Sequence, residues 1–343
     1  MTAADPALRQ RLYAAKLAAL VRSHWGAVVD DATPIPFAGG AALSVPGVVW
    51  VLAEERAERS LGPALLLASR RATDQLHLLA GPPAAGSLAR RATVFRLPTA
   101  VWTVEGRDVA EKGPDHVPQE PPLPDAAEPY RLLIRRAGAE PVVEAGILRA
   151  EVLGLEVGRV EVEEAGARLA VGVGKYDREA MRIVHGDDQG LPQLFEAVQF
   201  VSERRVPGRE GSPAYHLAPE RWLRSLVVDQ PHLVGAAELT PVPPPVVRGD
   251  LRETVPAPAA GTDQEGRRLL VLCSVGVDLD LVPTAADVWL ADGRQPRLVL
   301  CVPEGDAYPA LRELASLLHS PVQIVTVASA WRAGTEPAPP QPR

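Results

Sequence analysis

Two stretches of the chain, one near each end, alternate uninterrupted apolar runs with amphipathic segments in the same order. Residues 47–104 read as strand, helix, strand, helix and strand, and residues 267–327 repeat that order. The apolar runs lack polar alternation and are joined by segments of helical period, which is typical of parallel strands covered on both faces. The sequence therefore predicts an α/β protein with two flanking βαβαβ modules, each a parallel-sheet, Rossmann-like unit.

The spacing of the two copies is nearly equal. Val51 lies 27 residues before Leu78, and Leu272 lies 28 residues before Leu300. Two arrangements remain open: the copies are separate small domains, or they pack together around the middle of the chain. Three parallel strands leave two exposed edges, so copies that share a sheet or an interface are favoured.

The elements around the first module follow from apolar period and breakers. A helix is expected over 5–25, with Asp5 as N-cap and Pro6 as first helical residue, and a Pro/Gly-rich loop over 33–47. The module itself is expected to have strands at Val48–Ala53, Leu76–Ala80 and Thr99–Val104, with helices over 60–71 and 84–95.

Two Pro-rich segments, 111–129 and 240–266, read as extended linkers. They divide the chain into an N-terminal helix with the first module (1–110), a middle region (130–239), the second module (267–332) and a disordered tail (333–343). The middle region is expected to be α/β, with a β-hairpin. The expected elements there are a long strand over 144–163, a turn at Glu164–Gly166, a strand over 168–175, and helices over 130–138, 177–185, 191–205 and 219–228.

Composition narrows the class of protein. An apolar fraction of 46% excludes wholesale disorder, and no apolar run is long enough to span a membrane. The first residues lack the features of a signal peptide, so a cytoplasmic protein without a membrane partner is expected. The net charge of −7 weighs against nucleic acid as a partner. Cys273 and Cys301 lie in apolar strands and are expected to be reduced core residues.

Charged side chains follow the first strand of each module. Glu54, Glu55 and Arg56 do so in the first copy, and Asp278 and Asp280 in the second. Ligands of open parallel sheets bind at the carboxyl ends of the strands, so these five residues are candidates for ligand binding. No glycine-rich phosphate-binding motif is present. The plainer interpretation is that the two aspartates cap the next helix.

The middle region supplies candidate catalytic residues. Between Leu148 and Glu163 of the expected long strand, Glu156 is the one charge on the even-numbered face, so it needs a partner or a raised pKa. The expected hairpin places Glu156 opposite Gly174 or Lys175. Glu151 lies on the same segment with the opposite parity. The plainer interpretation is a structural ion pair between Glu156 and Lys175, or a carboxylate in water at the end of a strand.

This helix and strand hairpin, carrying Glu156, Lys175 and Glu151 within residues 130–177, resembles the core of the restriction-endonuclease-like nucleases. The resemblance implies that these three residues are catalytic and that Mg²⁺ activates water for phosphodiester cleavage. The sequence departs from the acid-x-lysine pattern of that family, because Gly158 stands where its lysine belongs. The phrases VLGLEVGRVEV, VGVGKYDREA and GVDLDLVPTAAD resemble a protein family of GC-rich actinobacteria, and this resemblance implies no activity.

The function that the sequence favours is therefore a non-catalytic one. We expect a protein without a cofactor that binds a protein partner or a small ligand at the surfaces of its modules. The alternative is a divergent metal-dependent phosphodiesterase or nuclease centred on Glu156 and Lys175, with Mg²⁺ as its cofactor. The acidic net charge and the incomplete motif favour the first function over the second.

Overall fold

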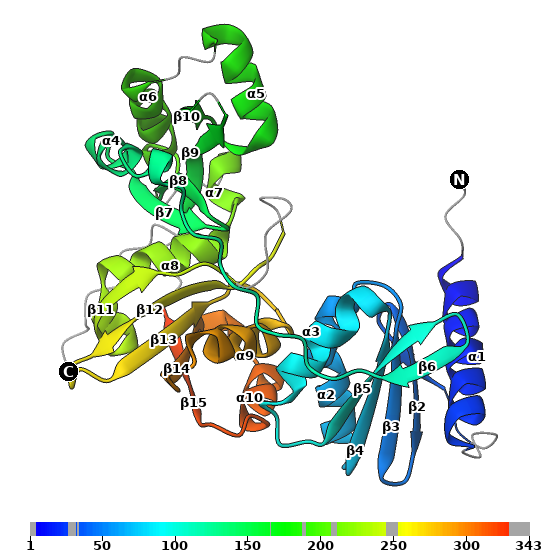
Figure 1. Ribbon diagram of the computed structural model, residues 1–343. Coiled ribbons are helices and arrows are strands. Elements are labelled where there is room, and N and C mark those ends of the chain that lie inside the picture. Colours follow the sequence, from blue (N-terminus) through cyan, green and yellow to red (C-terminus); the bar gives the residue numbers. More distant parts are fainter. Residues whose placement is uncertain are drawn as a thin grey trace. The chain divides into compact units, whose positions relative to one another are not determined.

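Three β-sheets with helices packed against them make up the computed structural model of this chain, which is a mixed α/β protein (Figure 1). The structure describes residues 5–26, 32, 34–164, 166–186, 190–206, 211–244 and 253–328. The predicted disordered tail, 333–343, lies outside the described residues. By internal contacts the chain divides into two units, of which the first is Met1–Val117, Leu279–Ala291 and Tyr308–Val322, and the second is Pro118–Asp278, Asp292–Ala307 and Gln323–Arg343.

The first sheet confirms the three parallel strands of the first module and adds strands at both edges. Its strands are β1 (Ile35–Phe37), β2 (Gly40–Val45), β3 (Val48–Ala53), β4 (Gln75–Ala80), β5 (Thr99–Glu105) and β6 (Asp108–Glu111), in that order. Strands β3, β4 and β5 are parallel, while β2 and β6 pair antiparallel with the outer two. The predicted loop over 33–47 is therefore wrong, because most of it forms the β1–β2 hairpin.

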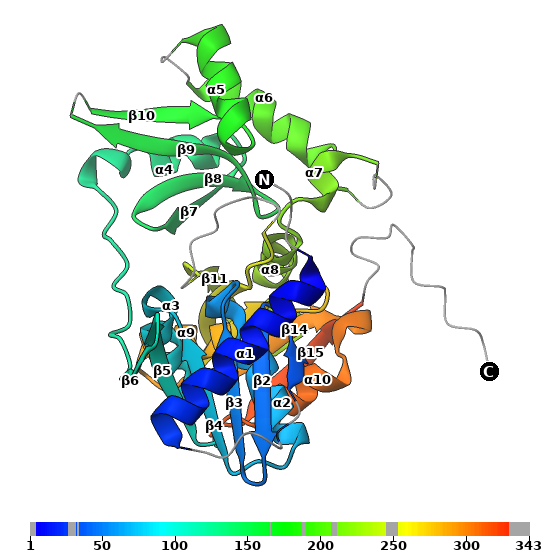
Figure 2. The same cartoon turned by 90° about the vertical axis from the view of Figure 1, so that its right-hand side faces the viewer.

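Helices cover both faces of this first sheet. They are α1 (Pro6–Trp25), α2 (Leu61–Arg70) and α3 (Pro82–Ala92). Figures 1 and 2 show α1 lying across one face, with α2 and α3 on the other. The predicted cap of α1 is confirmed, since Asp5 accepts a hydrogen bond of 3.0 Å from Ala7 N. Burial on both faces explains why these strands read as continuous apolar runs.

The sheet of the second module lies in the second unit and has five strands. They are β11 (Ala236–Pro241), β12 (Ala257–Asp263), β13 (Arg268–Cys273), β14 (Arg297–Pro303) and β15 (Val322–Val327), in that order. Strands β13 and β14 are parallel, and Cys273 and Cys301 are register partners with free, buried thiols, as predicted. The prediction of an extended linker over 240–266 is wrong, because this segment contains β12, which pairs with a strand on each side.

The repeat is longer than the sequence predicts. The second module has helices α8 (Pro219–Asp229), α9 (Leu281–Asp292) and α10 (Pro309–Ser316). The order α1-β1-β2-β3-α2-β4-α3-β5 of the first copy recurs in the second as α8-β11-β12-β13-α9-β14-α10-β15. This comparison leaves out the short 3₁₀ turns, which are η1 (Ala57–Arg59), η2 (Asp125–Ala127), η3 (Pro231–Val234) and η4 (Glu304–Asp306). Both copies therefore begin with a helix and an antiparallel three-strand meander, and the last strand of the meander is the first strand of the predicted βαβαβ unit.

Helices of the two copies meet inside the first unit through charged side chains. Asp287 of α9 accepts hydrogen bonds from Arg90 (2.9 Å) and Arg91 (2.6 Å) of α3, and all three are buried. Helices α10 and α2 also contact one another, with an ion pair of 3.1 Å between Glu313 and Arg70. The sequence favoured copies that share either a sheet or an interface. In the described residues the copies share no sheet, and they meet through an interface.

Equivalent positions of the two copies pair with one another at this interface. Phe95 and Leu318 form an antiparallel bridge, and each lies four residues before the last strand of its module. The neighbouring residues exchange two backbone hydrogen bonds, from Arg96 N to Leu317 O (2.8 Å) and from His319 N to Val94 O (2.9 Å). Such reciprocal contacts are typical of a two-fold interface, here between two parts of one chain.

The middle sheet has four antiparallel strands in the order β10-β9-β8-β7. Its strands are β7 (Glu140–Glu144), β8 (Ile147–Val152), β9 (Leu155–Glu163) and β10 (Gly166–Val171), and its helices are α4 (Tyr130–Arg136), α5 (Gly174–His185), α6 (Leu191–Ser202) and α7 (Pro213–His216). The predicted β9–β10 hairpin is confirmed. The predicted long strand over 144–163 is wrong, because a turn at Leu153 (φ 47°) and Gly154 (φ 76°) folds it into the β8–β9 hairpin.

Candidate functional site

The β8–β9 hairpin brings charged residues together on one face of the middle sheet. Glu151 of β8 is the register partner of Glu156 of β9, so both carboxylates lie on the same face. The parity of a single long strand had placed them on opposite faces, and the turn is the reason for the difference. Leu148 and Ala150 point to the other face, where they join the apolar core with α4 and α6.

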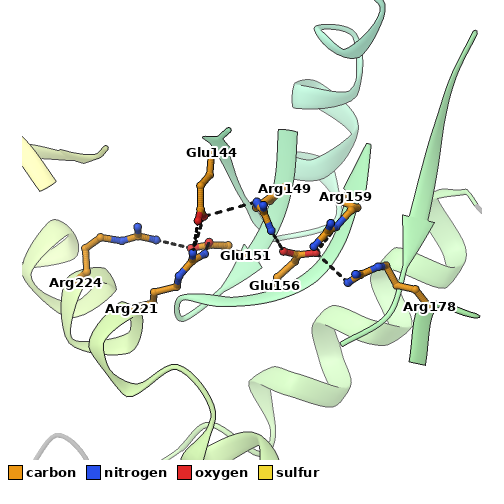
Figure 3. A network of polar contacts seen from close by, with 8 residues as sticks. All are labelled: Glu144, Arg149, Glu151, Glu156, Arg159, Arg178, Arg221 and Arg224. Atoms are coloured by element: carbon orange, nitrogen blue, oxygen red, sulfur yellow. Dashed lines mark hydrogen bonds and ion pairs between the residues drawn. The ribbon is translucent and has the colours of Figure 1, made fainter. Parts of the chain in front are cut away.

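Eight residues form a continuous arginine–glutamate network on this charged face (Figure 3). Five come from the sheet and three reach it from helices: Glu144, Arg149, Glu151, Glu156 and Arg159 from β7, β8 and β9, Arg178 from α5, and Arg221 and Arg224 from α8. Most of their side chains are buried, with Glu151 only 1% and Glu156 only 3% exposed. Buried charges of this kind need partners, and the network supplies them.

Helix α8 places two arginines in the network and an apolar side against the sheet of the second module. Arg221 donates to Glu151 Oε1 (2.6 Å) and to Glu144 Oε1 (2.7 Å), and Arg224 donates to the other oxygen of Glu151. Leu223 and Val227 pack in the core formed with β11–β13. Burial alone would lower the pKa of Arg221, but Glu151 and Glu144 raise it above its ordinary value.

Glu156 accepts hydrogen bonds from three arginines. They are Arg149, Arg159 (2.6 Å) and Arg178 (3.0 Å), the last of which comes from α5. Burial would raise the pKa of Glu156, but the three guanidinium groups outweigh it and hold the pKa below its ordinary value. Glu156 therefore stays ionised, and its charge ties α5 to the sheet.

This chemistry suits a structural clamp better than a catalytic centre. The carboxylates of Glu144, Glu151 and Glu156 already accept from guanidinium donors, which would have to be displaced before a metal ion could bind. Arginine keeps its proton in proteins and is a poor general base. Among the described residues, no group of three or more histidine, cysteine, aspartate or glutamate side chains is placed to hold a metal ion.

Lys175 lies apart from the carboxylates with which the sequence grouped it. Strand β10 ends at Val171 and α5 begins at Gly174, so Lys175 is an exposed residue in the first turn of a helix. In the part of the chain that the structure describes, it makes no ion pair with Glu156. The expected pairing is wrong because the strand was extended too far, and three arginines take the place of the lysine.

The arginine partners of Glu156 were missed, although the sequence carried two signals for part of the network. Arg149 and Glu151 alternate with apolar residues along β8, which marks a charged face. Arg221 and Arg224 are three apart on α8, on a different side from Leu223. No local pattern indicated that these charges would face one another.

The candidate ligand residues after β3 are engaged with α1. Glu54 accepts a hydrogen bond from Lys16 Nζ (2.7 Å), and Glu55 accepts one from the Tyr13 hydroxyl (2.8 Å). The hydrogen bond to Glu55 raises the pKa of Tyr13. Arg56 is exposed and has a positive φ of 50° before the short turn η1. Glu54 and Glu55 therefore join α1 to the end of β3.

The candidate residues after β13 are buried. Asp280 directly precedes α9, and its carboxylate accepts hydrogen bonds from the Thr284 hydroxyl (3.1 Å) and from Arg91 (3.4 Å). This position is the one that the capping interpretation predicts. Asp278 is only 3% exposed. The geometry therefore gives Asp280 a structural role at the start of the helix.

No helix in the described part of the chain is both long and apolar enough to cross a membrane. Comparison with known protein families, with curated proteins and with solved structures finds no match for this chain.

Proposed function

We propose that this protein is a non-catalytic binding protein that holds a protein partner through an exposed apolar stripe on α5. The stripe consists of Tyr176, Ala180, Ile183 and Val184, which share one side of the helix because they recur at i, i+4, i+7 and i+8. The side chains of Tyr176, Ile183 and Val184 are 86%, 77% and 73% exposed. Ala180 is exposed as well.

The orientation of α5 is the observation that carries this proposal. The residues of α5 that are half-buried against the domain are Gly174, Arg178 and Met181, which lie nearly opposite the stripe on the helix. Arg178 is held there by Glu156. An amphipathic helix ordinarily turns its apolar side inward. This one is held by a charge on its polar side, and exposed apolar surface of this kind marks interaction sites.

Helix α6 exposes further large apolar residues in the same domain. Leu191, Phe195 and Phe200 are 38%, 48% and 51% exposed, while Leu194 and Val198 on the same helix are in the core. Aromatic side chains are enriched at protein interfaces. On α5 the stripe residues recur at i, i+4, i+7 and i+8, and anchors at these spacings fit the helix-in-groove mode of recognition.

The binding function is favoured over a catalytic one by the state of the candidate carboxylates. Glu151 and Glu156 are sealed and bound by arginine, while Glu54, Glu55 and Asp280 serve internal contacts. No observation in the described residues favours the metal-dependent phosphodiesterase that the sequence left open.

A cross-linking experiment tests this function, because Lys175 is exposed beside the stripe and the chain has only two other lysines, Lys16 and Lys112. The purified protein is added to a lysate of the cells that encode it, treated with an amine-reactive cross-linker and analysed by mass spectrometry. We expect Lys175 to cross-link reproducibly to one site on a partner. Ile183→Glu should abolish this cross-link, because it places a charge in the apolar contact.

The matched control is Leu132→Glu, which changes a 55% exposed apolar residue on α4. It should leave the Lys175 cross-link unchanged. Cross-links confined to Lys16 and Lys112, or a Lys175 cross-link that persists in Ile183→Glu, would show that the stripe does not bind the partner.

A further inference from the structure

We propose that the outer edge of β15 is a second binding site, at which an extended, uncharged segment of a partner protein adds to the sheet as an antiparallel strand. This inference goes beyond the proposed function and does not depend on the α5 stripe. It is carried by the composition of β15 and by the way in which the first module covers the equivalent edge.

Strand β15 lies at the edge of the five-stranded sheet, and among the described residues no strand pairs with its outer side. Its sequence, Val-Gln-Ile-Val-Thr-Val, contains neither a charge nor a proline. Natural edge strands are ordinarily blunted by charged residues, proline or bulges, because their unpaired backbone groups attract other strands. A neutral edge rich in β-branched residues is therefore open to strand addition.

The other sheet edges in the described part of the chain are blunted. They are β1, β6, β7, β10 and β11. Each of them carries a proline or a charged residue, and β11 also has an irregular register. Examples are Pro36, Asp108, Pro141, Arg168 and Glu238, one on each of these strands in that order. Strand β15 is thus the exception, and the exception marks a binding edge.

The first module shows how such an edge is covered. There β6 pairs antiparallel with β5, the equivalent of β15, and Val109 of β6 lies opposite Val104 of β5. Both valines belong to the apolar cluster beside α1. Val327 is the sixth residue of β15, as Val104 is of β5, and it is buried in the core of the second module. A strand added to β15 therefore needs an apolar side chain opposite Val327.

The backbone groups that bind the added strand follow from the same comparison. Lys112 N donates to Val101 O (2.8 Å), so alternate residues of β5, Val101 and Thr103 among them, turn their N–H and C=O groups toward the β6 side. Counted from the start of each strand, these two residues correspond to Ile324 and Thr326 of β15. The N–H and C=O groups of Ile324 and Thr326 therefore face the partner.

The size of the edge identifies the partner as an extended segment. The six residues of β15 span about 20 Å. A stable interface between two folded proteins takes roughly 20–30 residues from each side, so β15 paired with β15 of a second copy would be too small on its own. An extended peptide gains affinity from main-chain hydrogen bonds along the edge and specificity from its alternate side chains.

The experiment selects binders from a phage-displayed library of short random peptides and titrates the synthesised peptides against wild type and two variants. Thr326→Pro removes an outward N–H at an edge position, where proline is tolerated, and should weaken binding by at least about tenfold. Glu111→Pro is the matched control, because it places proline on the edge strand β6 at a residue next to the inward-facing Lys112 N. It should bind like wild type.

Residue-resolved hydrogen exchange in wild type shows whether a selected peptide adds as a strand, whatever the stability of the variants. In the free protein the amides of Ile324 and Thr326 should exchange readily and that of Val325 slowly, because successive residues turn their backbone groups to opposite sides. The peptide should slow exchange at Ile324 and Thr326 by at least about tenfold and leave Val325 unchanged.

The combined pattern decides the proposal. Peptides that Thr326→Pro loses, that Glu111→Pro keeps and that protect both amides support it. A library without binders, equal binding by the two variants, or protection of Ile324 and Thr326 in the free protein overturns it. Protection in the free protein would mean that the chain itself or a second copy already covers the edge. The α5 stripe is tested separately by Ile183→Glu, so failure here leaves the proposed function standing.

Discussion

Replacing Glu151 by alanine is expected to lower the free energy of unfolding by about 3–5 kcal/mol, because the buried Arg224 loses its counterion and the buried Arg221 loses one of its two. Glu151 is 1% exposed, and its two oxygens accept from Arg221 and Arg224 of α8. Removing the carboxylate leaves the buried guanidinium group of Arg224 without its carboxylate, while Arg221 keeps only Glu144. Urea unfolding of Glu151→Ala and wild type, followed by circular dichroism, measures the difference.

The matched control is Glu163→Ala on the neighbouring strand β9. Glu163 also pairs with an arginine, Arg168 (3.1 Å), but its side chain is 60% exposed. Exposed ion pairs are worth about 1 kcal/mol or less, so this variant should unfold almost like wild type. Equal losses in Glu151→Ala and Glu163→Ala would contradict the view that the network is a sealed structural clamp.

Gly154→Ala is the second substitution for which we expect a large effect, a loss of about 2–5 kcal/mol. Gly154 has φ +76°, where a side chain is strained, and a Cβ atom there would lie 2.3 Å from the backbone carbonyl of Arg221. The β8–β9 turn would have to move away from α8. Thermal or urea unfolding of the variant measures the loss.

Gly106→Ala separates backbone strain from the steric clash. Gly106 also has a positive φ, +64°, at the turn between β5 and β6, but a Cβ atom added there would meet nothing within 4 Å. It should therefore lose only about 1 kcal/mol. If Gly154→Ala lowers the free energy of unfolding no more than Gly106→Ala does, the hairpin does not approach α8 as closely as the structure shows.

The parallel strands could be predicted from the sequence because burial on both faces leaves a clear pattern. Strands β3, β4 and β14 are apolar at nearly every central position, whichever face the residue points to. Strand β12, in contrast, begins Ala-Pro-Ala-Ala-Gly and has the composition of a linker. It is a strand because β11 and β13 both pair with its backbone, which no local pattern indicates.

The candidate site was predicted in part. The burial of Glu156 and its need for a cationic partner follow from the apolar segment around it, and the structure confirms both. The identity of the partner does not follow, because it depends on the turn at Leu153–Gly154. Leucine is unusual at a positive φ, so only Gly154 indicated that the strand ends there.

Helix α5 shows a different limit of sequence patterns. The helix itself was predicted, and the period of its apolar residues defines the stripe. Period alone favours a stripe that faces the core. In the structure the stripe faces outward instead, and Arg178, on another side of the helix, pairs with Glu156, which is 22 residues away and in a different element.

The orientation of α5 is the central claim, and the rate of thiol labelling in Ile183→Cys and Met181→Cys tests it most directly. The native cysteines, Cys273 and Cys301, are both 0% exposed and contribute little background. The two introduced thiols are two residues apart on one helix, so local unfolding exposes them equally. In dilute native solution we predict that the thiol at 183 reacts nearly as fast as in denaturant, and the thiol at 181 several-fold more slowly. A faster reaction at 181 than at 183 would contradict the outward apolar stripe and the binding function built on it.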